Sequence, residues 1–265
     1  MIKVLVSGYL GSMGNKVVNA VSSQDDMQVV AGVDINAPEN AEVADARGTV
    51  LAPGFANLGE AIEQTSPDVM VDFTHPSAVA GNIEVALSHG VDCVVGTTGL
   101  SGDELKRLEG LIPEGTTLFI APNFTTGAVL MMKFAQMAAR FFPDCEIIEL
   151  HHNHKADSPS GTAIRTANMI AEARDFECTS PGKETEVPGA EGARGALISG
   201  VPVHSVRSDG YVAHQEVILG SMGQTLTIRH DSYDRTSYMP GVLLAVRNVG
   251  DRQGLIVGLE NFMED

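Results

Sequence analysis

The sequence predicts an α/β fold with a parallel sheet in its first half and an antiparallel or mixed sheet in its second half. In the first half, short runs that are apolar throughout alternate with segments that can form helices. This alternation is typical of parallel strands covered by helices on both faces. In the second half, three β-rich runs follow one another closely, which favours strands joined by short connections.

The predicted strands of the first half each end in small or polar residues. They cover residues 2–6, 29–33, 69–73, 93–95 and 118–120, and residues 15–21, 77–89 and 101–111 can form helices between them. In folds of this kind the ligand crevice lies at the carboxyl ends of the strands. We therefore expect a binding site where these strands end.

The second half begins with a predicted helix at residues 126–141. A strand at 146–150, a histidine-rich loop and a helix at 161–173 follow. Residues 179–194 are rich in Gly, Pro and Glu, and we expect them to form an exposed loop. The three β-rich runs cover residues 201–206, 212–219 and 225–230, and residues 241–249 can form a last helix.

Charge and composition exclude several classes of function. The 265 residues include 17 Lys and Arg against 34 Asp and Glu, a formal charge of -17, so binding to nucleic acid or to an anionic membrane is not expected. Apolar residues make up 43% of the chain, and no uncharged run approaches the ~18 to 20 residues of a membrane helix. Three widely spaced cysteines without a CxxC pair, and an N-terminus without a signal-peptide pattern, predict a cytoplasmic location.

The first predicted strand runs directly into a glycine turn. Gly8, Gly11 and Gly14 form a G-x-x-G-x-x-G pattern that opens the first helix, in place of the commoner G-x-G-x-x-G. Such glycines let the backbone approach a pyrophosphate, whose charge is stabilised by free N–H groups at the helix N-terminus. Asp34 closes the second strand, where a carboxylate can accept hydrogen bonds from an adenosine ribose. Together they predict a dinucleotide site, although a glycine turn can also occur without a ligand.

The residues beside Asp34 bear on the choice of dinucleotide. Ile35 and Asn36 follow it, so no neighbouring Arg or Lys is available to neutralise a 2'-phosphate. A carboxylate facing that phosphate would be repelled by it. We therefore expect NADH in preference to NADPH, unless a basic residue reaches the phosphate from elsewhere in the fold.

A second cluster of functional residue types lies between residues 149 and 162. His151, His152, His154 and Lys155 supply cationic donors and a proton source in a chain with few positive charges. A helix start follows at residues 158–162, and a helix N-terminus binds carboxylate or phosphate. Together these features predict a small anionic substrate rather than a polymer.

Two other interpretations of this cluster stay open at the level of sequence. Any single histidine can simply cap a helix or form a hydrogen bond near a strand end. His151, His152 and His154 could also ligate zinc. Catalytic zinc, however, commonly takes a carboxylate or a distant third ligand, and the adjacent Lys155 would repel the cation. We therefore expect no metal here.

Taken together, these motifs resemble those of the 4-hydroxy-tetrahydrodipicolinate reductase family of diaminopimelate and lysine biosynthesis. The similarity covers nearly the whole chain and includes residues 8–14, 72–74, 95–99, 121–124, 149–162 and 230–241. The stretch 151–155 followed by 158–162 is similar to the family signature and is far more specific than the glycine turn. The resemblance implies NAD(P)H-dependent reduction, with hydride delivered to C4 of the dihydrodipicolinate ring, a small dicarboxylate.

The resemblance also implies the domain organisation. A Rossmann dinucleotide-binding domain would comprise residues 1–125 and 238–265, and an inserted α+β domain with a mixed sheet, residues 126–237, would bind substrate and assemble a homotetramer. At matching positions the cofactor contacts would be Gly8, Tyr9, Leu10, Gly11, Ser12, Met13, Asp34, Gly96, Thr97, Thr98, Ala121, Pro122, Asn123 and Phe124.

Substrate and proton-transfer roles follow from the same resemblance. His152, Gly161 and Thr162 would hold the substrate carboxylate, and His151 and Lys155 match the proton-donating positions. Which of these two gives the proton stays open. Two features depart from the family pattern: Ile35 stands where some members carry Arg, which disfavours NADPH, and Tyr9 and Leu10 make the glycine turn bulkier than in many members.

Three other hypotheses are compatible with parts of the sequence. Another dinucleotide-dependent reductase would need a cysteine nucleophile or a different arrangement of His and Lys. A non-catalytic NAD-binding sensor would not need the His151 and Lys155 pair. A zinc hydrolase would use the histidine cluster, and metal analysis of the purified protein would reveal it.

Overall fold

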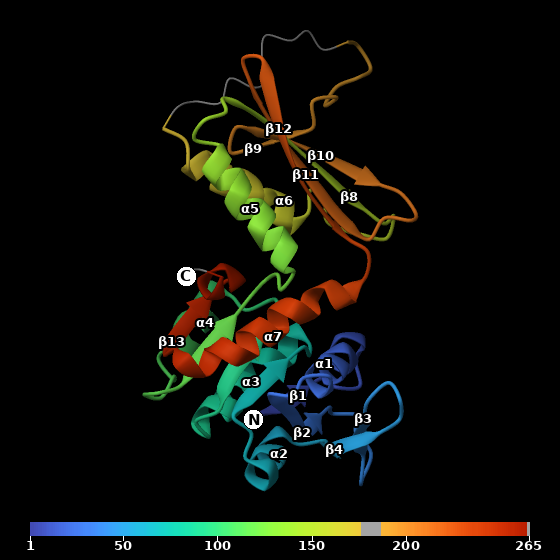
Figure 1. Ribbon diagram of the computed structural model, residues 1–265, viewed down its shortest axis with the longest axis vertical. Helices are drawn as coiled ribbons and strands as arrows, with labels where there is room; N and C mark the ends of the chain where they lie inside the picture. The colour runs from blue at the N-terminus through green and yellow to red at the C-terminus, as the bar shows by residue number, and fades with distance from the viewer. Residues whose placement is uncertain (176–186, 264–265) are drawn as a thin grey trace. The chain divides into compact units, whose positions relative to one another are not determined.

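The structure is a computed structural model that describes residues 1–175 and 187–263. The chain divides into two compact units, one formed by Met1–Thr126 with Arg235–Asp265 and the other by Gly127–Asp234. The division falls at 126/127 and 234/235, where the family resemblance placed it at 125/126 and 237/238. The chain thus enters the second unit once and returns to the first (Figure 1).

The first unit contains an eight-stranded sheet in the order β13-β7-β6-β5-β1-β2-β4-β3. Its strands are β1 (Ile2–Ser7), β2 (Met27–Val33), β3 (Glu42–Ala44), β4 (Val50–Phe55), β5 (Val69–Asp72), β6 (Asp92–Val95), β7 (Thr117–Ile120) and β13 (Gly254–Val257). All neighbouring strands are parallel except β3, which is antiparallel to β4. The strand order reverses at β1, which lies between β2 and β5 and therefore defines the ligand-binding position of a doubly wound sheet.

Several helices of the first unit begin at residues whose side chains cap them. They are α1 (Ser12–Ser22), α2 (Leu58–Thr65), α3 (Pro76–Ser88), α4 (Gly102–Glu109) and α7 (Met239–Asn248), with 3-10 turns η1 (Arg235–Tyr238), η2 (Val249–Asp251) and η3 (Leu259–Phe262). Asn57, His75 and Ser101 cap α2, α3 and α4 with their side chains, and Ser101 forms a capping box with Glu104. These polar residues fix where each helix starts.

The central strands are apolar on both faces because both faces are covered. Leu5, Met70, Cys93 and Leu118, from β1, β5, β6 and β7, are all fully buried and belong to one core cluster with residues of α2 and α3. Such strands are expected to be continuous apolar runs rather than alternating ones. The prediction of a parallel sheet from these runs is confirmed.

The second unit is a five-stranded mixed sheet with two helices. Its elements are α5 (Thr126–Ala138), β8 (Asp144–His151), α6 (Gly161–Glu172), β9 (Ala196–Ile198), β10 (Val201–Arg207), β11 (Ala213–Ser221) and β12 (Gln224–Ser232). The strand order is β12-β11-β8-β10-β9, with β10 parallel to β8 and β11 antiparallel to both β8 and β12. The predicted mixed sheet is confirmed, and α5 and α6 lie on one side of it (Figure 1).

Five elements were not predicted from the sequence: β3, β4, α2, β9 and β13. Pro53 and Gly54 interrupt the apolar pattern of β4, and β3 and β9 span only three residues each. Residues 179–186 of the expected loop, and Cys178, lie outside the described residues, whereas 187–194 form exposed turns. Cys93 and Cys145 are buried. In the part of the chain that the structure describes, no helix is long and apolar enough to cross a membrane.

Candidate active site

The glycine turn between β1 and α1 requires glycine for steric reasons. Gly8 has a φ of 84°, and a Cβ atom there would lie 2.5 Å from the carbonyl oxygen of Phe73. A Cβ atom on Gly14 would lie 2.1 Å from the carbonyl oxygen of Gly8, so the first turn of α1 packs directly on the loop. Glycine is therefore needed at both positions so that the turn can pack closely against the loop after β5 and against α1.

The N-terminus of α1 differs from those of α2, α3 and α4. Its N-cap residue is Gly11, which has no side chain, whereas each of the other three helices receives a side-chain hydrogen bond at its N-cap. The first-turn N–H groups of α1 therefore have no capping side chain, and the first turn carries no acidic residue. Such a helix start is suited to a phosphate group. Ser12 and Met13, in its first turn, are exposed and half-buried, respectively.

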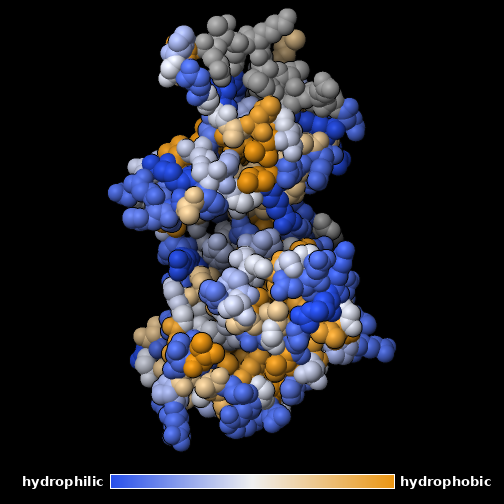
Figure 2. All heavy atoms as spheres, turned by 180° about the vertical axis from the view of Figure 1, so that it is seen from behind, coloured by the Kyte–Doolittle hydropathy of each residue, from blue (hydrophilic) through white to orange (hydrophobic). Residues whose placement is uncertain are grey.

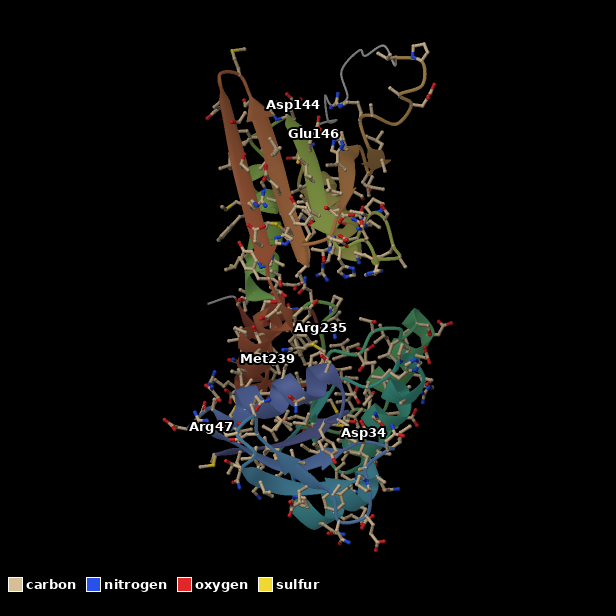
Figure 3. All side chains as sticks on the ribbon, turned by 90° about the vertical axis from the view of Figure 1, so that its right-hand side faces the viewer. Asp34, Arg47, Asp144, Glu146, Arg235 and Met239 are labelled. Atoms are coloured by element: carbon tan, nitrogen blue, oxygen red, sulfur yellow. The ribbon has the colours of Figure 1, made fainter. Side chains whose placement is uncertain are left out.

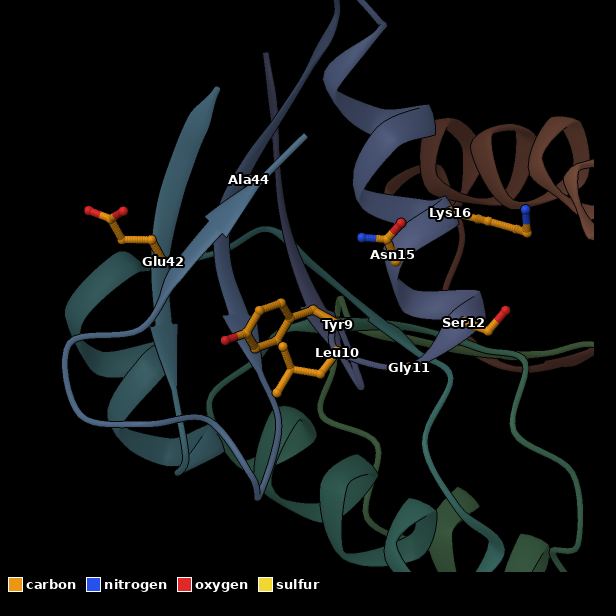
Figure 4. A pocket seen from close by; sticks show the side chains of 8 residues that line it. All are labelled: Tyr9, Leu10, Gly11, Ser12, Asn15, Lys16, Glu42 and Ala44. Carbon is orange, nitrogen blue, oxygen red and sulfur yellow. The ribbon is translucent and has the colours of Figure 1, made fainter. Parts of the chain in front are cut away.

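A cavity of about 520 Å³ opens beside this turn (Figure 4). Its lining residues are Tyr9, Leu10, Gly11, Ser12, Asn15 and Lys16 from the turn and α1, with Glu42 and Ala44 from β3. Lys16 is a basic residue close to the glycine turn. It was not predicted from the sequence to belong to this site, because it lies a full helical turn beyond Ser12. The cavity is therefore not uniformly acidic.

Tyr9 does not make the turn bulkier, contrary to the expectation from sequence. Its side chain is only 5% exposed and fills space left by Gly32 and Gly54, where an added Cβ would come within 2.7 Å and 2.6 Å of Tyr9 atoms. Burial, followed by the negative charge of Asp34, raises the pKa of the Tyr9 phenol. Leu10, 52% exposed, is the side chain of this pair that faces solvent.

Asp34, labelled in Figure 3, lies directly after β2, at the carboxyl end of the sheet where the glycine turn follows the parallel strand β1. Its Oδ1 accepts hydrogen bonds from the backbone N–H of Asn36 at 3.0 Å and from the Asn36 side chain at 3.2 Å. These bonds hold one carboxylate oxygen and leave Oδ2 for a ribose hydroxyl. Ile35 beside it is 86% exposed. This geometry fits the diol of an adenosine ribose.

A buried carboxylate organises two further loops at the same edge. Asp72, at the end of β5, is fully buried and accepts hydrogen bonds from Thr97 Oγ1 at 2.6 Å, Thr74 Oγ1 at 2.8 Å and Asn82 Nδ2 at 2.8 Å. The Thr97 hydroxyl also accepts from the backbone N–H of Thr74 at 2.7 Å. Because the Thr97 side chain is used in this network, any contact with a cofactor would come from its backbone or from the exposed neighbour Thr98.

The segment after β7 is fixed by aromatic packing. Ala121 and Phe124 are 2% and 1% exposed, and the Phe124 ring lies 5.7 Å from that of Phe73 and 5.9 Å from that of Phe119. Pro122 is exposed and Asn123 is half-buried. All four residues of the segment 121–124 were expected to contact the cofactor. Pro122 and Asn123 can therefore offer their side chains, whereas Ala121 and Phe124 can offer only backbone atoms.

The second group of predicted residues lies at the end of β8. Glu149 and His151 are two residues apart on one strand, so their side chains point to the same face. His151 Nδ1 lies 2.5 Å from Glu149 Oε2, and the Glu149 side chain is fully buried. A carboxylate can only accept here, so Nδ1 carries the proton of this bond and Nε2 is the ring nitrogen available for chemistry.

Arg207, the last residue of β10, completes this group. Its Nη1 and Nη2 donate to the two Glu149 oxygens at 2.9 Å and 2.8 Å, and Nη2 also donates to the carbonyl of Asp157 at 2.8 Å. Burial alone would raise the pKa of Glu149, but hydrogen bonds from His151, Arg207 and Ser205 outweigh it and lower the pKa to about 2. Glu149 is therefore a carboxylate at neutral pH.

Lys155 lies in the loop after β8 and has an acidic partner. Its Nζ is 2.7 Å from Asp157 Oδ1, with the Lys155 side chain 21% exposed and that of Asp157 57% exposed. The hydrogen bond from Lys155 is the main reason that the pKa of Asp157 is lowered, and the backbone of Gly161 contributes to the same effect. Asp157 thus contacts Lys155, which was expected to take part in proton transfer, and the backbone of Gly161, which was expected to hold the substrate carboxylate.

The start of α6 follows this loop. Ser160 is the N-cap and accepts a hydrogen bond from the N–H of Ala163 at 3.2 Å. Gly161 is exposed, and an added Cβ there would have no atom within 4 Å, so the space beside this residue is open. Thr162 is half-buried in the first turn. This helix start can bind a carboxylate.

His152 and His154 are exposed, and their ring centroids are 6.2 Å apart. The Nδ1 atom of His151 already forms a hydrogen bond with Glu149. Among the described residues, no group of three or more His, Cys, Asp or Glu side chains is arranged to hold a metal ion.

Sequence reasoning missed Arg207, Asp72 and the roles of Glu149 and Asp157. Arg207 is 58 residues from Glu149 in sequence, and only the parallel pairing of β8 with β10 brings them together. Glu149 carried a usable signal, because it is a charged residue between Ile148 and Leu150 in a predicted strand. Buried charges in such positions are expected to be paired.

The doubly wound sheet with its glycine turn, together with a separate unit that carries a paired histidine and a helix start without acidic residues, is typical of a dinucleotide-dependent oxidoreductase. The sequence profile described as "Dihydrodipicolinate reductase, N-terminus" matches residues 2–124, and "Dihydrodipicolinate reductase, C-terminus" matches residues 127–263. The chain belongs to the dihydrodipicolinate reductase family, whose members are NAD(P)H-dependent.

Full-length relatives agree with this assignment. A 4-hydroxy-tetrahydrodipicolinate reductase from Listeria welshimeri is 49% identical over 99% of this chain and 100% of its own length, and one from Mycobacterium sp. strain KMS is 48% identical over 99% of both. The solved dipicolinate-bound dihydrodipicolinate reductase from Paenisporosarcina sp. TG-14 superposes with a TM-score of 0.87 at 41% identity, covering 98% of this chain and 99% of that one. An amine dehydrogenase from Mycobacterium smegmatis, 14% identical with a TM-score of 0.64, shares the fold.

Proposed function

We propose that this protein catalyses the NAD(P)H-dependent reduction of 4-hydroxy-tetrahydrodipicolinate, by way of dihydrodipicolinate, to tetrahydrodipicolinate in diaminopimelate and lysine biosynthesis. The observation that carries the proposal is the buried Glu149–His151 pair beside the open helix start at Gly161, in a chain that matches the reductase family along its whole length. These groups provide a proton donor and a carboxylate site for a small dicarboxylate.

The dinucleotide site is the carboxyl edge of the first unit's sheet. The α1 start at Gly11 would bind the pyrophosphate, Asp34 the adenosine ribose, and the loops after β5, β6 and β7 the remainder. The described residues fit such a group, because α1 lacks a capping side chain and carries no acidic residue in its first turn. When bound, the dinucleotide supplies the hydride that adds to C4 of the substrate ring.

We infer that NADH is preferred over NADPH. The free oxygen of Asp34 suits a 2'-hydroxyl, and the exposed Ile35 offers no positive charge for a 2'-phosphate. Lys16 is the basic residue among those that line the cavity beside the turn. Steady-state KM values for NADH and NADPH, measured for the natural chain and for Lys16→Ala, test this: equal KM values for the two dinucleotides in the natural chain would contradict it.

The second unit would hold the substrate and supply the proton. The N–H groups at Gly161 and Thr162 and the His152 side chain would bind a carboxylate, in exchange for Asp157. Lys155 would stabilise the negative charge that develops on the ring as hydride arrives. His151 would give the proton from Nε2 when the ring is protonated at both nitrogens, because its Nδ1–H is committed to Glu149.

The activity is tested by a coupled assay with the condensation product of pyruvate and aspartate semialdehyde. Loss of a general acid costs about 10²- to 10⁴-fold in rate, so His151→Gln should lower kcat by at least ~100-fold. Lys155→Ala should lower kcat and raise KM together. His154→Gln, an exposed histidine in the same loop, is the matched control and should stay within about twofold of the natural chain. Full activity in both His151→Gln and Lys155→Ala would contradict the assigned roles.

We also propose that the protein forms a homotetramer in the cytoplasm. The edge strand β12 is nine residues long, lies at one end of the sheet order and exposes Leu226 to 38%. Long exposed edge strands are normally covered by another chain or element. Apolar residues are also visible on the surface of the second unit in Figure 2. Sedimentation of the purified protein as a monomer would contradict the tetramer.

A further inference from the structure

We propose that Glu149, held by Arg207, is the positioning residue of this enzyme: its carboxylate fixes the ring of His151 and the start of α6 in one arrangement. The inference rests on the proposed role of His151 as proton donor. It assigns functions to two residues, Glu149 and Arg207, that would contact neither substrate nor cofactor.

The Glu149 carboxylate is placed to orient the His151 ring. Both side chains point to the same face of β8, and the Glu149 side chain has no exposed surface while that of His151 is 14% exposed. The bond from Nδ1 to Oε2 selects one tautomer and one ring orientation, with Nε2 directed away from the carboxylate. A histidine without this partner could rotate about χ1 and χ2 or exchange its tautomer.

Arg207 keeps the carboxylate itself in place. Two parallel N–H donors on two oxygens form a bidentate pair, which fixes the carboxylate plane as well as its position. The Arg207 side chain is 19% exposed, so the pair is largely removed from water. A third bond from Arg207 to the Asp157 carbonyl ties the loop that carries Lys155 to the end of β10.

The same carboxylate reaches the helix start that we propose for the substrate. Oε1 accepts a hydrogen bond from the backbone N–H of Ser160 at 3.3 Å, and Ser160 is 3% exposed. Glu149 therefore contacts His151, Arg207 and Ser160, which lie on three different segments of the second unit. One buried carboxylate thus fixes the positions of the proposed proton donor, His151, and of Ser160, the residue before Gly161.

A purely structural ion pair would have the same burial and the same distances. A positioning role and a purely structural role for Glu149 differ in what happens when His151 is absent. If Glu149 acts on catalysis through His151, its substitution costs nothing further in turnover once His151 is gone. If Glu149 only stabilises the fold, its cost to turnover is independent of His151 and the two losses multiply.

The experiment is a double-mutant cycle on the full-length protein with Glu149→Gln and His151→Gln, measured in the coupled assay as kcat and KM. Glutamine keeps the shape of the side chain, but one of its two oxygens becomes an NH₂ donor that faces other donors. Glu149→Gln should lower kcat about 10- to 100-fold in the natural background, within the range available to a general acid. In the His151→Gln background it should change kcat by less than about twofold.

Glu146→Gln is the matched control. Glu146 lies on the same strand but on the opposite face, where it pairs with His204 at 2.7 Å and with Arg194 (Figure 3 shows Glu146 on β8). It should leave kcat within about twofold. Binding of NADH, followed by fluorescence titration, should be unchanged in every variant, because the dinucleotide residues lie in the other unit.

A second variant covers the case in which Glu149→Gln does not fold. Arg207→Lys keeps the charge opposite Glu149 but loses the bidentate geometry, and it should lower kcat by roughly 3- to 10-fold only when His151 is present. The proposal is overturned if Glu149→Gln is folded and keeps kcat within twofold, or if its loss is the same with and without His151. A fully active His151→Gln would instead overturn the proposed role of His151 itself, and this inference with it.

Discussion

Replacing Glu149 by glutamine should make the stability of this protein less dependent on pH below neutrality. The carboxylate is fully buried, and hydrogen bonds from His151, Arg207 and Ser205 more than offset the effect of burial on its pKa, which is lowered from 4.5 to about 2. The folded state therefore favours the ionised form. Such a group stabilises the fold fully above pH 4.5, and this stabilisation is lost as the pH falls towards 2.

The lowered pKa sets the size of the effect. A fall from 4.5 to about 2 corresponds to ~3 kcal/mol of the free energy of unfolding at neutral pH. On this basis about 1 kcal/mol of it is lost between pH 6 and pH 4. Glutamine has no proton to lose, so the stability difference between the natural chain and Glu149→Gln should shrink by that amount over this interval.

Urea denaturation of both proteins at pH 6 and pH 4, at equal protein concentration, measures this difference. The other carboxylates titrate in both proteins and cancel when the two are subtracted. Glu146→Gln, whose carboxylate is 32% exposed, is the control and should show a smaller change with pH. A difference between the natural chain and Glu149→Gln that stays constant, or that grows as the pH is lowered, would refute the reasoning.

Three further predictions concern other sites. Asp157→Asn should lower the substrate KM by up to about fivefold, because it frees Lys155 from a partly exposed ion pair; an increased KM in the coupled assay would contradict this. Gly96→Ala should weaken NADH binding at least ~10-fold in a fluorescence titration, because the new methyl group would lie 2.1 Å from Phe73 Cε1, whereas Gly81→Ala, with open space around it, should bind as the natural chain does. Ser101→Ala should lower the free energy of unfolding by about 1 kcal/mol through loss of the α4 capping box, and should lower the melting temperature without changing kcat.

Much of the first unit could be predicted from sequence because its signals are local. The runs at β1, β5 and β6 are apolar throughout since helices cover both faces, and such runs are visible without knowledge of the fold. The cap at Ser101 with Glu104 is likewise a local pattern. By contrast β4, with Pro53 and Gly54, is defined by its pairing with β2 and β3 rather than by its own pattern.

The candidate site was predicted in part. The histidine cluster and the helix start at Gly161 are adjacent in sequence, so their composition alone indicated anion binding and proton transfer. That Nδ1 of His151 faces Glu149 could not be predicted from the sequence. The arrangement of hydrogen-bond donors around the Glu149 carboxylate depends on distances that no sequence pattern contains.

The class of sheet, the glycine turn, Asp34 and the residues of the loop after β8 could be predicted from local patterns, because helix and strand periodicity, turn residues and helix caps are properties of short segments. Tertiary structure decided that Tyr9 is buried and that Arg207 reaches Glu149, 58 residues away. The physical reason is that these contacts arise from strand register and from the space left by Gly32 and Gly54. Register and packing are set by the whole sheet, and they determine which His151 nitrogen is available for chemistry.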